Sequence, residues 1–139
     1  MAKNQIRTQS KKRDEVLSLI ERLHPVKLNI NLVRLGPNYD GGYLVPDDLD
    51  DIDACFSPGV YNISDFEYAC SEKGMKLFLA DKSIDKPKID LAEHKYEFLP
   101  KFIGASNNDD FITLDAWALN SNISKNGDLL LQMDVEGWE

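Results

Sequence analysis

The sequence lacks any long hydrophobic run. No apolar stretch approaches the ~20 residues needed to cross a bilayer, and the basic opening, MAKNQIRTQSKKR, has no apolar core of the signal-peptide kind. There are only two cysteines, Cys55 and Cys70. Without a secretory signal, we expect both to be reduced, buried thiols in a cytoplasmic protein that does not bind membranes.

Histidine is equally scarce. His24 and His94 lie far apart and neither has a partner at ligand spacing, so no zinc site is predicted. The phosphate-binding glycine motifs are also missing. There is neither a three-glycine dinucleotide fingerprint nor a G-x-x-x-x-G-K-[ST] loop.

Basic residues are outnumbered: 16 Lys and Arg stand against 24 Asp and Glu, for a formal net charge of -8. Such a surface repels nucleic acid, so we expect no nucleic-acid partner. What the chain does have is apolar content, 42% over 139 residues. That is enough for one packed domain.

Two regions follow from the pattern. We expect residues 1–30 to form a basic tail and an amphipathic helix, and residues 31–139 to form the domain. Ser10 can cap a helix that runs to Leu23. One side of this helix is apolar and consists of Val16, Leu17, Ile20 and Leu23. Such a stripe predicts packing against the main body or a second subunit. The segment VKLNINLVRL (26–35) could be a strand, and GPNYDGGYLVP after it indicates a shaped loop.

Short apolar runs then alternate with a helix signal. IDACFSPGV and KLFLA are typical of buried strands, and LLLQM (129–133) is a further one. Between the first two, Ser64 and Glu67 have the spacing of a capping box, and Gly74 suits the left-handed end of the helix. A weaker unit lies around YEFLPKFIGAS, and the segment 111–119 could be a short helix or an edge element. The pattern predicts an α/β, Rossmann-like parallel sheet with its ligand at the carboxyl ends of the strands.

Three residues occupy those strand ends. Gly59 allows the backbone to pass close to a ligand, and Asp81 follows it by 22 residues, near the ~20-residue spacing at which an acid binds a ribose diol. Asp134 ends a further strand. With no phosphate motif present, a ligand containing adenosine but little phosphate is favoured, and S-adenosylmethionine has that description.

Several segments in the same order resemble the FkbM-type methyltransferases. They are RLGPNYDGGYLVP, SPGVYNISDFE, a strand ending LAD, FITLDAW and LLLQMDVEGWE. The resemblance implies a class I methyltransferase fold that uses S-adenosylmethionine to methylate a hydroxyl group. The acceptor would be a small molecule or glycan: a sugar, a polysaccharide or a secondary metabolite.

The resemblance also implies roles for single residues. Gly59 would lie against the methionine part of the cofactor, Asp81 would hold the ribose hydroxyls, and Ser106 would lie by the adenine. Asp134 would face the transferred methyl group. Arg34, with the DGGY loop, would help to close the pocket and meet the cofactor carboxylate.

The chain departs from the family pattern at two points. Many members carry an acid two residues before the first glycine, where this chain has Ser57, so the resemblance assigns no partner to the cofactor's amino group. A full class I fold also has about three more strands. We therefore expect residues 31–139 to be the cofactor-binding part, with the C-terminal strands absent.

Asp134 and Glu136 are the candidate catalytic residues. Residues two apart in a strand project to the same side, so either could take a proton from the acceptor hydroxyl. They could instead hold Mg²⁺, which the sequence does not require, and Glu136 could simply cap a following helix. Two further alternatives stay open: a non-catalytic cofactor-binding or interaction module, and a metal-dependent sugar-nucleotide enzyme. A homo-oligomer could form through the N-terminal helix or an exposed sheet edge.

Overall fold

The structure is a computed structural model that describes residues 13–61, 63–92, 95–124 and 126–135. Its helices are α1 (Arg13–Arg22), α2 (Asp65–Glu72) and α3 (Leu114–Asn120). Its strands are β1 (Leu32–Leu35), β2 (Tyr43–Pro46), β3 (Ile52–Pro58), β4 (Lys76–Ala80), β5 (Tyr96–Leu99), β6 (Phe102–Ile103), β7 (Phe111–Ile112) and β8 (Asp128–Leu131).

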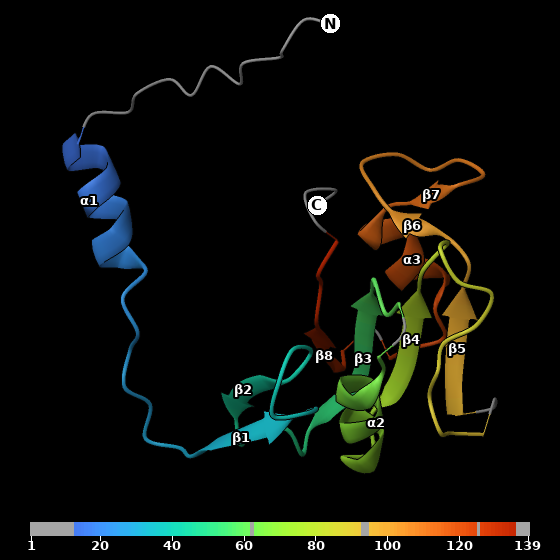
Figure 1. Cartoon of the computed structure of the whole chain (residues 1–139), viewed down its shortest axis with the longest axis horizontal. Coiled ribbons are helices and arrows are strands. Elements are labelled where there is room, and N and C mark those ends of the chain that lie inside the picture. Colours follow the sequence, from blue (N-terminus) through green and yellow to red (C-terminus); the bar gives the residue numbers. More distant parts are fainter. Residues whose placement is uncertain (1–12, 62, 93–94, 125, 136–139) are drawn as a thin grey trace, which may run out of the picture.

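Four strands form one parallel sheet in the order β5-β4-β3-β8 (Figure 1). The chain therefore starts this sheet in the middle, builds outward through β4 and β5, and then returns to the other side of β3. This order is compatible with a Rossmann-like fold, in which the first strand lies between the second and the fourth. The predictions of an α/β class and of parallel strands at IDACFSP and KLFLA are confirmed.

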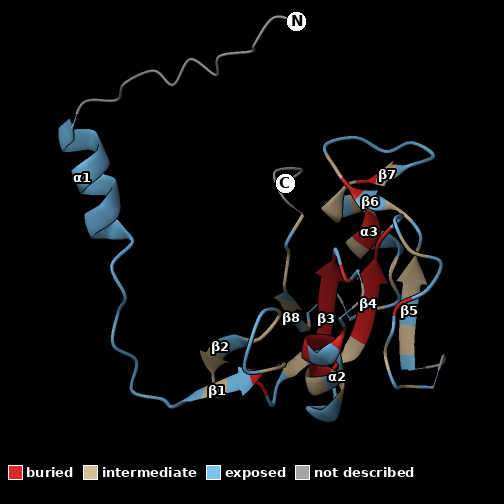
Figure 2. Ribbon diagram, viewed as in Figure 1, coloured by how far each residue is buried: buried red, intermediate tan, exposed pale blue. Residues whose placement is uncertain are grey.

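Both faces of the sheet are covered, because successive side chains along β3 point to opposite faces. Cys55 packs in one cluster with Phe66 and Cys70 of α2. Phe56 packs in the other cluster with Trp117 of α3. The two helices thus lie on opposite faces, and β3 and β4 between them form the buried centre (Figure 2).

The cysteines belong to this core. Cys55 and Cys70 are both fully buried free thiols, as predicted. A hydrogen bond with Cys70, together with burial, raises the pKa of the Cys55 thiol. Cys55 therefore stays protonated at neutral pH and serves packing.

The FITLDAW segment contains both of the elements left open for it. Phe111–Ile112 pairs with Phe102–Ile103 as a short ribbon, and α3 begins directly afterwards. The Thr113 hydroxyl accepts the backbone N–H of Ala116 at 3.2 Å and so caps the helix. Trp117 then lies edge-on to Phe56, with ring centroids 4.9 Å apart. This motif therefore anchors a crossover helix to the sheet.

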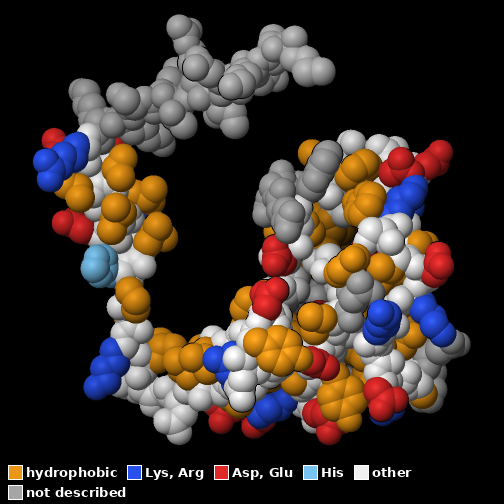
Figure 3. Space-filling model, in the orientation of Figure 1, with side chains coloured by type: hydrophobic (Ala, Val, Ile, Leu, Met, Phe, Trp, Pro, Cys, Tyr) orange, Lys and Arg blue, Asp and Glu red, His pale blue; other side chains and the backbone are white. Residues whose placement is uncertain are grey.

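The N-terminal helix differs from its prediction. α1 begins at Arg13 in the described residues, and Ser10 lies outside them. No residue of α1 is buried, and its apolar side chains gather along one exposed side (Figure 3). The predicted packing against the main body is thus wrong, because α1 is connected to β1 by an extended segment that carries it away from the sheet. No helix among the described residues is long and apolar enough to cross a membrane.

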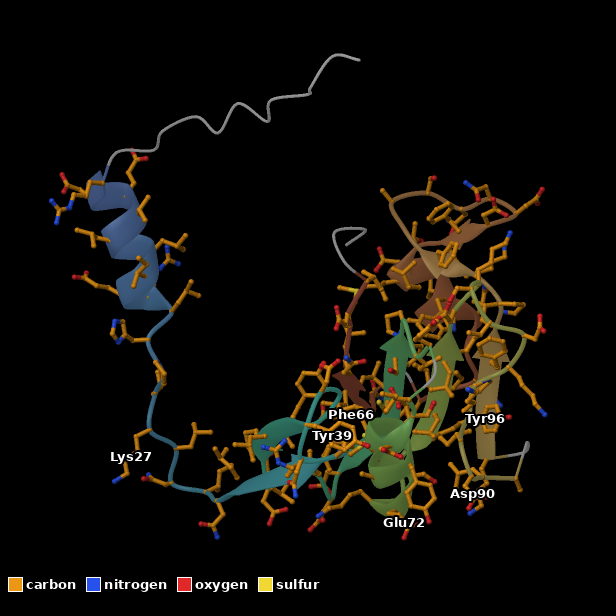
Figure 4. All side chains as sticks on the ribbon, viewed as in Figure 1. Lys27, Tyr39, Phe66, Glu72, Asp90 and Tyr96 are labelled. Carbon is orange, nitrogen blue, oxygen red and sulfur yellow. The ribbon has the colours of Figure 1, made fainter. Side chains whose placement is uncertain are left out.

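The segment expected as a strand over 26–35 is a strand only at its end. β1 pairs antiparallel with β2, with Leu35 opposite Tyr43, and the GPNYDGG loop joins them. Phe66, labelled in Figure 4, lies where this hairpin meets α2. Its ring lies edge-on to Tyr43 at 5.5 Å between centroids. This contact fixes the loop above the carboxyl end of β3.

Candidate functional site

A cavity with a volume of about 680 Å³ lies at the carboxyl ends of β3, β4 and β8. β3 stands between the other two strands, so the cavity lies where the strand order reverses. That is where α/β sheets of this kind bind ligands. Besides the turns that follow these strands, the hairpin loop contributes Asp40 and Gly41, and the β6–β7 ribbon contributes Phe102 and Phe111.

Gly59 brings two of these strand ends into contact. Its φ of +86° is in the region that favours glycine. A Cβ atom placed there would lie 2.5 Å from the carbonyl oxygen of Asp134. The Gly59 N–H donates to the Ala80 carbonyl at 2.9 Å. The turn therefore closes tightly on the backbone after β8, and a side chain at this position would separate the two.

Asp81 is held in a defined orientation in the cavity wall. Its side chain is only 5% exposed. Oδ2 accepts the backbone N–H of Tyr61 at 2.9 Å, and Oδ1 accepts both the N–H and the hydroxyl of Ser83, at 2.8 and 2.6 Å. A carboxylate has about four acceptor positions. One position on Oδ2 therefore remains for a ligand hydroxyl, and a second becomes free if the Ser83 hydroxyl turns away.

Glu67 corrects the predicted capping box. Ser64 is the N-cap of α2, but its side chain makes no capping hydrogen bond. Glu67 does not return to the helix N-terminus either. It is 3% exposed, and the Ser57 hydroxyl lies 2.5 Å from its Oε1 atom. The face of α2 that carries Glu67 packs on the sheet, and the buried strand end provides a partner there that the local sequence does not reveal.

The polar contacts continue from Ser57 across the sheet. Ser57 Oγ lies 2.9 Å from Oε1 of Gln132, and Gln132 Nε2 donates to the Tyr43 hydroxyl at 3.3 Å. One hydroxyl has one proton and cannot donate to both Glu67 and Gln132. Two arrangements resolve this. The Gln132 amide can be turned so that its Nε2 donates to Ser57, or a protonated Glu67 can donate to Ser57 while Ser57 donates to Gln132.

The surroundings of Glu67 favour that protonated form. Burial raises the pKa of Glu67, and the charge of Asp65 raises it further. The hydrogen bonds from Ser57 and from the backbone of Glu67 lower it, but burial is the larger effect. The result is a buried, readily neutralised acid in the wall of the cavity.

The structure brings together three of the predicted site residues and separates others. Gly59, Asp81 and Asp134 all line the cavity, and Asp134 is an exposed residue. Ser106 is exposed and is not one of the lining residues. The expected position of Ser106 beside the adenine is therefore not reproduced, because the wall next to Asp81 comes from the β6–β7 ribbon.

Arg34 has a different task from the one expected. Its Nη1 atom donates to the carbonyl oxygens of Pro37 and Gly42, at 3.2 and 3.1 Å. It therefore holds the hairpin loop in shape and is not one of the residues that line the cavity. Glu136, the second candidate catalytic acid, lies outside the described residues.

The charge of the cavity is one-sided. Four acids line it, and no Lys, Arg or His is among its described lining residues; the acids are Asp40, Glu67, Asp81 and Asp134. Within the part of the chain that the structure describes, no group of three or more His, Cys, Asp or Glu side chains is arranged to hold a metal ion. The cavity thus offers acceptors to a ligand rich in donors or positive charge, and it disfavours phosphate.

Sequence reasoning missed Glu67 and Gln132 as cavity residues. Glu67 matched a local capping pattern, and Gln132 lay inside an apolar run. One signal was available: Ser57 and Gln132 are polar residues in runs that are otherwise apolar, and buried polar groups need partners. Comparison of the chain with models of protein families, with curated proteins and with solved structures found no match.

Proposed function

We propose that this chain is the cofactor-binding part of an S-adenosylmethionine-dependent O-methyltransferase of the FkbM type. The acceptor would be a hydroxyl group of a sugar, a polysaccharide or a secondary metabolite. The observation that carries the proposal is the cavity at the reversal of strand order, with a buried aspartate that has an acceptor position left and with no basic side chain in its described lining.

The residues present suit this cofactor in three respects. The cavity volume of about 680 Å³ lies within the ~300–1,000 Å³ usual for small-molecule sites. Asp81 can accept from a ribose hydroxyl. Phe102 and Phe111, whose ring centroids are 5.7 Å apart, offer an apolar surface for a purine ring. No basic side chain is among the described lining residues, which argues against a dinucleotide, whose phosphates need such partners or a glycine-rich loop.

When bound, S-adenosylmethionine would supply a methyl group attached to a positively charged sulfur. The work of this chain would then be positioning, which can contribute ~7–11 kcal/mol to lowering a barrier. Asp134 lies at the cavity mouth next to Gly59. There it would accept the proton of the attacking hydroxyl, an effect worth typically ~10²–10⁴-fold in rate.

Calorimetric titration with S-adenosylhomocysteine tests the proposal. The chain should bind one equivalent, and Asp81→Asn should weaken binding by about tenfold to a hundredfold, because one hydrogen bond to a charged group is lost. Asp47→Asn is the matched control, since the Asp47 side chain lies away from the cavity lining and makes a surface ion pair with Lys73 at 3.4 Å. A folded chain that gives no heat with the ligand would contradict the proposal, and so would an Asp81→Asn variant that binds like the control.

One observation favours a second candidate, a non-catalytic interaction module. β8 is an edge strand of the four-stranded sheet, and its Leu129 and Leu131 are 43% and 48% exposed. An exposed apolar edge can pair with a strand of another chain. Light scattering on the wild type and on Leu131→Lys separates the candidates. A dimer that the substitution abolishes favours the module, and a monomer in both cases excludes pairing through this edge.

A further inference from the structure

Glu67 has one carboxylate oxygen without a partner among the described residues. Its Oε1 atom is bonded to Ser57, but Oε2 is buried and makes no hydrogen bond. Buried polar atoms of native proteins are nearly always paired, and an exception needs an explanation. Glu67 also lines the cavity, so the missing partner can come from a ligand.

The position of Glu67 indicates which part of a ligand would reach it. Through Ser57 and Gln132 it is connected to the junction of β3 and β8. Asp81 follows β4, on the other side of β3. A ligand whose sugar lies at Asp81 would therefore extend its other end along the cavity toward Glu67.

We propose that Glu67 binds the ammonium group at the amino-acid end of the ligand. This inference rests on the proposed function. It assigns a partner to the cofactor's amino group, which the sequence analysis left without one because Ser57 occupies the position where the family usually has an acid. An ammonium group carries three donors and a positive charge. One N–H can therefore donate to Oε2, and the positive charge balances the negative charge of the carboxylate. Oε2 is buried in the free protein, so binding requires the side chain to turn toward the cavity that Glu67 lines.

No Lys, Arg or His is among the described residues that line the cavity with Glu67. The described titratable groups that act on Glu67 or share its cavity wall on the neighbouring elements are acids or neutral side chains: Asp65 on α2, Cys55 on β3, Tyr43 on β2 and Asp134 after β8. In the free protein these surroundings favour a neutral Glu67. A bound ammonium group favours the carboxylate, so ligand binding should release a proton from Glu67.

Two ligands separate this contact from the rest of the site. S-adenosylhomocysteine has the amino-acid end, and 5′-methylthioadenosine lacks it but keeps the sugar and the base. Glu67→Gln should weaken the first ligand by about tenfold to a hundredfold, as expected for loss of a charged partner, and should leave the second unchanged. Asp81→Asn is the control, and it should weaken both ligands.

A measurement on the wild type keeps the test independent of any folding defect in the variant. Calorimetry in buffers of different ionisation enthalpy, slightly above the ordinary glutamate pKa of 4.5, counts the protons exchanged on binding. Binding of S-adenosylhomocysteine should release protons, and binding of 5′-methylthioadenosine should not. Equal effects of Glu67→Gln on both ligands, or equal proton exchange with both, would overturn the inference while leaving the proposed function intact. Binding of neither ligand by the wild type would overturn both.

Discussion

Gly59→Ala tests the closest backbone approach in the candidate site. The φ of Gly59 is +86°, and an alanine in the left-handed region costs roughly 1–2 kcal/mol. The new Cβ would also lie 2.5 Å from the Asp134 carbonyl oxygen. Relieving such an overlap moves the backbone, at a typical cost of ~1–3 kcal/mol. The variant should therefore lose about 2–5 kcal/mol of stability in all.

Gly74→Ala is a matched control for the conformational part of this cost. Gly74 has a φ of +91°, and a Cβ there would meet nothing within 4 Å. It should lose only the roughly 1–2 kcal/mol of the left-handed conformation. The difference between the two variants then isolates the contact of Gly59 with Asp134.

Urea denaturation followed by circular dichroism measures both losses under the same conditions. Thermal unfolding gives a second reading, since each kcal/mol corresponds to about 2–4 °C in a domain of about this size. Gly59→Ala should also weaken S-adenosylhomocysteine binding, because it displaces Asp134, whereas Gly74→Ala should not. Equal losses of stability in the two variants would refute the close approach of Gly59 to the end of β8.

Two other predictions concern stability. Trp117→Ala should cost about 3–5 kcal/mol, because Trp117 is 5% exposed and contacts Phe56. Leu119→Ala on the same helix is the control, and it should cost under about 0.5 kcal/mol because Leu119 is 82% exposed. Similar losses of stability for the two variants in urea denaturation would contradict the packing of Trp117 against Phe56. Because burial raises the pKa of Glu67, the folded state holds its proton more tightly than the unfolded state. The free energy of unfolding of the wild type should then fall as pH rises from 4.5 through the higher folded pKa of Glu67. Glu67→Gln should remove this fall, and identical pH profiles of stability for the wild type and the variant would contradict the prediction.

The centre of the sheet was predictable because β3 and β4 are buried on both faces. KLFLA is apolar almost throughout, and Gly59 and Asp81 end their strands where backbone geometry requires a turn. Such signals depend on near neighbours in the sequence. The positions of Gly59, Asp81 and Asp134 around one cavity follow from parallel pairing alone.

What could not be predicted depends on distant contacts. The Ser64–Glu67 spacing satisfies a capping box, but the sequence does not tell which side of α2 meets the sheet. Parallel pairing places Ser57 beside that side, and Glu67 bonds there instead. Ser106 lies outside the described cavity lining for a related reason, since the wall includes Phe102 and Phe111 of a short ribbon whose pairing is not evident from the local sequence.

The hairpin was only half visible in the sequence. Its loop was recognisable from glycine and proline, but its position over the cavity depends on the contact between Tyr43 and Phe66. α1 shows the opposite case. Its stripe is strong in the sequence, yet Leu23 is 72% exposed, because periodicity predicts an apolar face and not what covers it.

The most direct test of the central claim is amide chemical-shift mapping of the chain with S-adenosylhomocysteine. The account predicts saturable shifts at the amides of Gly59, Tyr61 and Ser83, which surround Asp81 and the end of β3. The amide of Leu119, on an exposed part of α3, should stay unchanged. A well-dispersed spectrum that does not respond, or shifts confined to residues away from the cavity, would contradict it.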